Sequence, residues 1–93
     1  MSQSAVRREV YFHGRVQGVG FRQTTYDLAR QFRVVGFVQN LPAGRVLLTA
    51  EGEPDELDRF VAGIVAAMGR RVAGYDIDET PAHGDFHDFT IRY

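Results

Sequence analysis

The stretch of this sequence with the most evident chemical capacity is residues 14–22, which read Gly-Arg-Val-Gln-Gly-Val-Gly-Phe-Arg. Its glycines permit backbone angles that other residues disfavour and let a ligand approach the backbone closely. Successive N–H groups in such a loop can converge on an anion. Arg22 ends the loop with a planar guanidinium that suits bidentate contact with a phosphate or a carboxylate. These features predict an anion-binding loop, and a plain glycine-rich turn with a solvated arginine is the alternative.

The chain lacks most of the side chains that perform covalent catalysis. It has no cysteine and no lysine, its only serines are Ser2 and Ser4, and its one asparagine is Asn40. These absences exclude disulfides, thiol catalysis, Schiff-base lysines and a P-loop. A serine nucleophile would have to come from the first four residues. The sequence therefore favours chemistry that needs no covalent nucleophile.

Hydrophobic periodicity predicts the elements that must position the loop. Alternating apolar residues indicate strands, and apolar residues at i, i+3, i+4 and i+7 indicate helices. The expected strands cover residues 6–13, 34–41, 45–51, 72–80 and 89–93. The expected helices cover residues 21–32 and 54–68, and the second has an apolar stripe of Leu57, Phe60, Val61, Ile64, Val65 and Met68. The glycine-rich loop thus runs into a helix N-terminus, whose unpaired N–H groups and dipole attract negative charge.

The order of these elements is βαββαβ with a short extra strand at the C-terminus. Each expected helix has one apolar stripe, so both can bury it against the same face of a sheet. The pattern predicts an α+β, ferredoxin-like two-layer sandwich, with an antiparallel sheet and two helices on one face. We expect a single domain over residues 6–93 after a disordered N-terminal tail at residues 1–5. The composition, 44% hydrophobic and 25% charged with a formal net charge of −1, is that of an ordinary globular chain.

Two stretches resemble the acylphosphatase family. Residues 14–22 resemble its first signature, in which a phosphate-binding loop ends in a catalytic arginine. Residues 36–40, which read Gly-Phe-Val-Gln-Asn and are followed by Gly44, Val46 and Gly52, resemble its second signature, which carries a catalytic asparagine. The resemblance covers about residues 6–93 and agrees with the expected fold.

The resemblance implies an enzyme that hydrolyses the carboxyl–phosphate anhydride of an acyl phosphate to a carboxylate and inorganic phosphate. Arg22 and Asn40 would be the catalytic residues, with Arg22 holding the phosphoryl oxygens and Asn40 orienting the attacking water. The phosphate-binding residues would be Gln17, Gly18, Val19, Gly20, Phe21 and Arg22. The implied enzyme needs no metal and no other cofactor, and its partners are a small acyl phosphate and inorganic phosphate. We expect a cytoplasmic monomer that binds neither nucleic acid nor membrane.

Several other residues allow competing interpretations. His13 precedes the loop and could be a base, and Thr24 or Thr25 could assist the site by hydrogen bonding. His83 and His87, near Asp85, could suggest a metal, although a solvated turn is favoured because they do not share a helix face. An RNA-binding module is an alternative function because RNA-recognition domains share the split βαβ layout and stack bases on sheet aromatics, here Tyr11 and Phe37. A phosphate sensor without catalytic activity is another.

Overall fold

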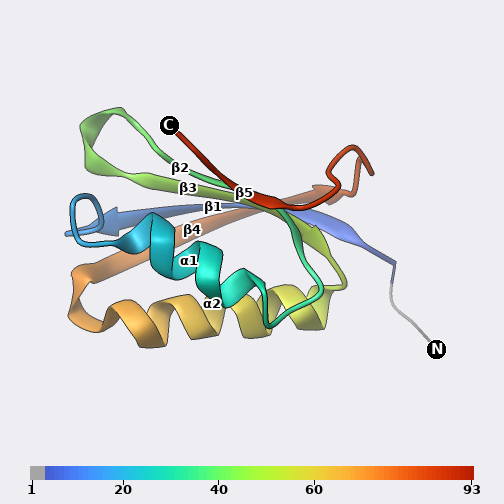
Figure 1. Ribbon diagram of the computed structural model, residues 1–93, viewed down its shortest axis with the longest axis horizontal. Coiled ribbons are helices and arrows are strands. Elements are labelled where there is room, and N and C mark those ends of the chain that lie inside the picture. The colour runs from blue at the N-terminus through green and yellow to red at the C-terminus, as the bar shows by residue number, and fades with distance from the viewer. Residues whose placement is uncertain (1–3) are drawn as a thin grey trace.

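The computed structural model describes residues 4–93, which form five strands and two α-helices (Figure 1). In chain order the elements are β1 (Val6–Gly14), α1 (Phe21–Ala29), β2 (Val35–Asn40), β3 (Val46–Gly52), α2 (Pro54–Met68), β4 (Val72–Pro81) and β5 (Phe89–Arg92). Short 3-10 turns lie at Pro42–Gly44 and Gly69–Arg71. The tail predicted at residues 1–5 lies mostly outside the described residues. None of the helices formed by residues 4–93 is long and apolar enough to cross a membrane.

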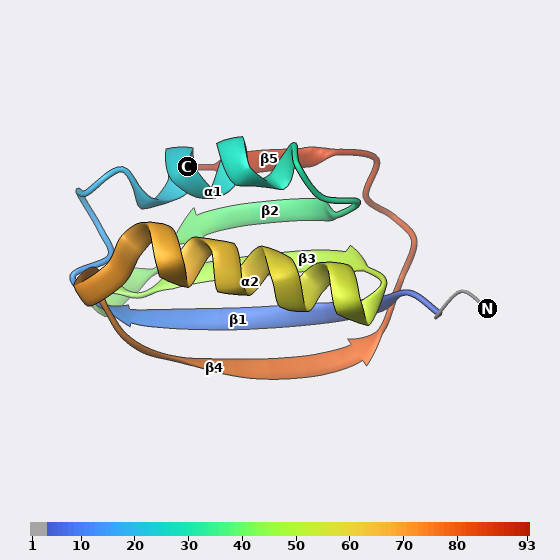
Figure 2. The ribbon, with the colours of Figure 1, turned by 90° about the horizontal axis from the view of Figure 1, so that it is seen from below.

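The strands form one sheet in the order β4-β1-β3-β2-β5. Both helices cover the same face of this sheet, so the molecule has two layers (Figure 2). The first and third strands lie side by side in the centre, with Val10 opposite Leu48 and Phe12 opposite Val46. This arrangement confirms the predicted ferredoxin-like α+β sandwich.

The prediction of a wholly antiparallel sheet was wrong for one strand. β5 pairs with β2 in parallel, with Phe37 opposite Thr90 and Gln39 opposite Arg92. β4 runs antiparallel to β1 and therefore ends where β1 and β2 begin. The segment after β4 crosses that end of the sheet, so β5 must start beside the beginning of β2 and run in the same direction. The sheet is consequently mixed.

The core lies between the sheet and the helices. Val10 and Phe12 of β1, and Leu48 of β3, are fully buried, as their alternation predicts. The predicted stripe of α2 is buried apart from Val65, which is partly buried against the core. α1 ends at Ala29 rather than at residue 32, because Gln31 and Phe32 turn back to donate N–H hydrogen bonds to the carbonyls of Leu28 and Ala29. Phe32 still packs on Phe60, with ring centroids 5.7 Å apart.

Gly36 in β2 is a point of very close backbone approach. Its φ is +142°, and a Cβ at this position would lie 1.9 Å from the carbonyl oxygen of Thr49. Its N–H donates to the carbonyl of Asp88, just before β5, at 2.9 Å. Only glycine fits between these neighbours, and the contact holds β2 against both β3 and the start of β5.

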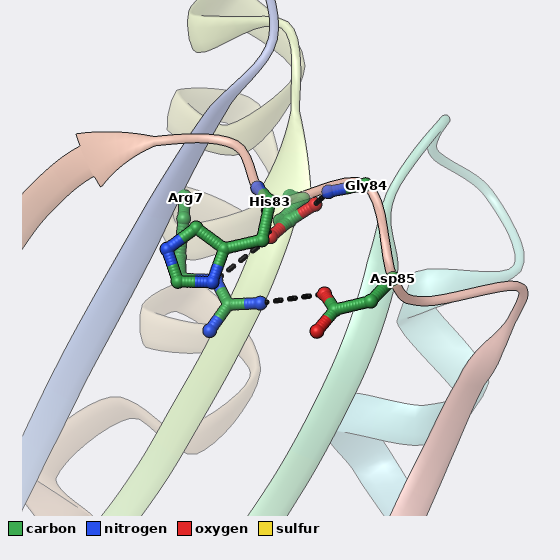
Figure 3. A network of polar contacts seen from close by, with 5 residues as sticks. Arg7, His83, Gly84 and Asp85 are labelled. Carbon is green, nitrogen blue, oxygen red and sulfur yellow. Dashed lines mark hydrogen bonds and ion pairs between the residues drawn. The ribbon is translucent and has the colours of Figure 1, made fainter.

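A buried carboxylate fastens the segment between β4 and β5 to the sheet (Figure 3). Glu51 of β3, which is 4% exposed, accepts hydrogen bonds from the N–H groups of His83 and Gly84 at 2.9 and 3.0 Å. It also pairs with Arg7 Nε of β1 at 2.7 Å, and Arg7 in turn reaches Asp85. Burial opposes the charge of Glu51, but the two backbone donors and Arg7 outweigh it, so the pKa of Glu51 is lowered from 4.5.

We expect Glu51→Gln to lower the free energy of unfolding by about 2 kcal/mol at pH 7, because the amide leaves buried donors without a charged acceptor. For a domain of this size the melting temperature should fall by about 8–16 °C. A carboxyl whose pKa is lowered by folding stabilises the protein above its unfolded pKa of 4.5, and this contribution is lost as the pH falls through the lower folded value.

Urea denaturation at pH 7 and pH 3 should therefore show a larger difference between wild type and Glu51→Gln at pH 7 than at pH 3. Glu53→Gln is the matched control, because Glu53 is exposed and its side chain makes no capping hydrogen bond. Equal stabilities of wild type and Glu51→Gln at pH 7 would contradict the assignment.

Candidate active site

A cleft of about 160 Å³ opens where the β1–α1 loop meets the ends of β2 and β5. The residues that line it are Val16, Gly18, Gly20, Phe21, Arg22, Gln23, Asn40, Ile91 and Tyr93. Arg22 and Asn40, which lie on different elements, thus share one cavity. No aspartate, glutamate or histidine lines it among the residues that the structure describes. The cleft is positively charged and is lined by two carboxamides, Gln23 and Asn40, of which Gln23 donates to Asp27.

The loop that forms one wall has its backbone donors unpaired. Gly18 and Gly20 have φ of +74° and +79°, the left-handed region that glycine tolerates. Within residues 4–93 the N–H groups of residues 16–23 donate to no other backbone group, and the first helical bond is that of Thr24 to Gly20. α1 begins without a side-chain cap and without an acidic residue in its first turn. These donors and the positive end of the helix are therefore free to bind an anion.

Arg22 is held at the mouth of the cleft by β5. Phe21 anchors the start of α1, since its buried ring packs on Phe12 with centroids 5.0 Å apart. The Arg22 guanidinium lies 4.9 Å from the ring centroid of Tyr93, and one of its nitrogens donates to the carbonyl of Arg92 at 3.5 Å. No site residue was predicted in β5 from the sequence, because its parallel pairing with β2 was not predicted.

Asn40 is the last residue of β2 and is partly buried. The turn after it closes with a hydrogen bond from Leu41 N to the carbonyl of Arg45 at 2.8 Å. Ala43 in this turn has a φ of +66° and is the one non-glycine residue with a positive φ in the described part of the chain. The hairpin thus fixes Asn40 at the end of the sheet, facing the loop that carries Arg22.

Of the predicted phosphate-binding residues, Gly18, Gly20, Phe21 and Arg22 line the cleft. The side chains of the other two point elsewhere. Val19 packs against the core, and the Gln17 amide bonds to the turn after Asn40. Any contact of these two residues with a bound anion must therefore come from their backbone N–H groups.

The other sequence candidates do not line the cleft. His13 is exposed on β1, with its ring against Gly74 of β4. Thr25 is fully buried and its hydroxyl has no hydrogen-bond partner. Thr24, in the next position along α1 toward its start, is partly buried outside the lining. The cleft therefore gives these side chains no direct contact with a ligand.

The possible metal ligands gather far from the cleft around Arg7. Glu51, His83 and Asp85 have ligand atoms within 4.8 Å of one another. Arg7 lies between both carboxylates and donates to each, at 2.7 and 3.0 Å, so a guanidinium already supplies the positive charge there. His83 contacts Glu51 through its backbone N–H. This arrangement favours a structural ion-pair cluster over a metal site.

The open face of the sheet does not present paired aromatic rings. Phe37 is 8% exposed, because Phe86 packs on its ring at 5.9 Å and the Arg92 guanidinium covers it at 3.6 Å. Tyr11 is partly buried, with Arg45 over its ring at 5.3 Å. Stacking of RNA bases needs exposed ring faces, so this surface argues against the RNA-binding alternative.

Comparisons with known proteins identify the family of this chain. The acylphosphatase family model matches residues 8–91. An acylphosphatase of Archaeoglobus fulgidus is 48% identical over 86 residues, covering 91% of this chain and 96% of the relative. One of Rubrobacter xylanophilus is 41% identical over 87 residues, covering 92% and 79%. The crystal structure of acylphosphatase from Bacillus subtilis superimposes with a TM-score of 0.87 at 31% identity, covering 95% and 99%. The chain belongs to the acylphosphatase family, whose members are hydrolases that act on acyl phosphates.

Proposed function

We propose that this chain hydrolyses acyl phosphates by binding the phosphoryl group in the cleft and directing water at it. The loop N–H groups and Arg22 hold the phosphoryl oxygens, and Asn40 orients the water. The observation that carries the proposal is that Arg22, Asn40 and the unpaired donors of the loop all border one cleft. We also propose that the functional unit is a monomer.

Binding of the phosphoryl group follows from the charge of the cleft. Phosphoryl transfer passes through a loose transition state with charge spread over three equatorial oxygens, so positioning and electrostatic stabilisation supply most of the catalysis. Preformed N–H donors and one guanidinium meet this requirement without reorganising during the reaction. Asn40 lines the same cleft as Arg22, which supports a role in holding a water against the phosphorus.

The reaction needs no side chain to take or give a proton. The water oxygen bonds to phosphorus as the bond from phosphorus to the carboxyl oxygen breaks, and the carboxylate leaves with the bonding electrons. A carboxylate is a good leaving group, because its conjugate acid has a pKa near 4. The proton of the water passes to a phosphoryl oxygen of the substrate, since no aspartate, glutamate or histidine lines the cleft in the described part of the chain.

The decisive experiment compares an anhydride with an ester that has the same phosphoryl group. Benzoyl phosphate should be hydrolysed with inorganic phosphate released, and inorganic phosphate should inhibit competitively. Phenyl phosphate, whose leaving group has a pKa of about 10, should react at least about 10³-fold more slowly, because no aspartate, glutamate or histidine among the described residues lines the cleft to protonate the leaving oxygen.

A wild-type protein that does not hydrolyse benzoyl phosphate would overturn the proposed function. Equal rates on benzoyl and phenyl phosphate would show that the protein is a phosphatase, but would contradict a mechanism without a general acid. Non-competitive inhibition by phosphate would place its binding outside the cleft.

A further inference from the structure

The side chain of Gln17 ties the phosphate-binding loop to the turn that follows Asn40. Its Nε2 donates to the carbonyl of Leu41 at 2.7 Å and to the carbonyl of Arg45 at 2.9 Å. Both hydrogens of this amide are therefore used, and Gln17 does not line the cleft. These two carbonyls lie on either side of the turn at Pro42–Gly44, so one side chain is hydrogen-bonded to both ends of the turn.

The turn itself needs such a restraint. Pro42–Gly44 forms one 3-10 turn, and its central residue, Ala43, adopts a left-handed conformation at φ +66°. A non-glycine residue in this region costs about 1 kcal/mol or more and persists only where its surroundings hold it. The turn's own backbone bond from Leu41 to Arg45 is joined by the two bonds from Gln17. All three bonds therefore end on Leu41 or Arg45, the residues on either side of the turn that follows Asn40.

We infer that Gln17 is a positioning residue that sets the distance between the anion-binding loop and the water-orienting side chain of Asn40. The inference rests on the proposed role of Asn40. The loop determines where phosphorus lies, and the turn determines where the water lies. A displacement of about 1 Å between reacting groups can lower a rate by about 10²-fold, so a rigid link between these two segments acts directly on turnover.

The test separates catalysis from phosphate binding. Gln17→Met keeps the length of the side chain and removes both donors. We expect kcat for benzoyl phosphate to fall by about 10- to 100-fold, while the inhibition constant of inorganic phosphate changes by less than about twofold, because the loop donors remain. Gln31→Met is the matched control, because Gln31 is exposed at the end of α1 and lies away from the cleft.

A double-mutant cycle identifies the residue through which Gln17 acts. In an Asn40→Ala background, Gln17→Met should lower kcat by less than about twofold, because the group that it positions is already gone. The inference would be overturned if Gln17→Met lowered kcat by the same factor in the Asn40→Ala background as in the wild type. It would also be overturned if Gln17→Met raised the inhibition constant of inorganic phosphate by as large a factor as it lowers kcat.

A second variant keeps the test valid if Gln17→Met does not fold. Gln17→Asn retains the amide but is one methylene too short to reach both carbonyls, and the same results are expected of it. Failure of the proposed function is distinguishable from failure of this inference. A wild type that is inactive on benzoyl phosphate would overturn the function, and a fully active single variant Asn40→Ala would overturn the role of Asn40. An active wild type with an impaired Asn40→Ala and an unimpaired Gln17→Met would overturn this inference alone.

Discussion

Replacing Arg22 with alanine is expected to lower kcat/KM for benzoyl phosphate by about 10³-fold or more, the size of effect known for arginines that stabilise phosphoryl transfer. Arg22 is the cationic side chain at the cleft, and its guanidinium is placed by Tyr93 and by the carbonyl of Arg92. Inorganic phosphate should also lose most of its inhibition. Steady-state kinetics with and without added phosphate measure both effects.

Two variants sharpen this test. Arg22→Lys keeps the charge but not the planar fork, so we expect it to recover only a small part of the lost activity. Arg30→Ala removes an arginine that is exposed at the other end of α1, and it should leave kcat/KM within about twofold of wild type. Full activity in a folded Arg22→Ala protein would show that the phosphoryl group binds elsewhere.

Replacing Asn40 with alanine should lower kcat by about 10²- to 10³-fold and leave phosphate inhibition nearly unchanged, because the water loses its hydrogen bonds and the anion does not. This separation distinguishes the roles proposed for Arg22 and Asn40. Asn40→Asp should weaken phosphate inhibition as well, because it adds a negative charge to the cleft. Kinetics at several phosphate concentrations measure the two effects together.

Gln39→Ala is the control for the second test. Gln39 carries the same carboxamide on the preceding residue of β2, and successive side chains of a strand point to opposite faces. It does not line the cleft, so its removal should change kcat by less than about twofold. An Asn40→Ala enzyme with wild-type kcat would assign water placement to the loop backbone or to the substrate.

Local chemistry made part of this molecule predictable. The apolar stripe from Leu57 to Met68 predicts a helix because its 3.6-residue spacing is a property of the local sequence and does not depend on distant residues. The anion site is also indicated by local features alone. Residues 14–20 contain three glycines, and the positive charge of Arg22 in the first turn of a helix is unfavourable to the helix dipole unless an anion offsets it. The pairing of β1 with β3 follows from the handedness of crossovers.

The remaining features depend on contacts between distant residues. Glu51 gives no sign in the sequence that it accepts from the backbone of His83 and Gly84 or pairs with Arg7, 44 residues away. The parallel pairing of β5 depends on the path of residues 82–88 across the end of the sheet, which periodicity does not encode. Tyr93 was consequently missed as a neighbour of Arg22, and the bonds of the Gln17 side chain were missed because glutamine has no local preference for distant carbonyls.

The place of β5 has a consequence for the folding of this chain. The carbonyl that holds Arg22 lies 70 residues along the chain, and β5 reaches it by pairing with β2 and by packing Phe89 on Phe60. Such long-range closure is entropically costly and slows folding relative to local contacts. The candidate active-site cleft is thus among the most non-local parts of the molecule, whereas α2 is among the most local. During refolding, recovery of enzymatic activity therefore measures the pairing of β5 with β2. Recovery of helix content measures the formation of local structure, which does not require a complete cleft.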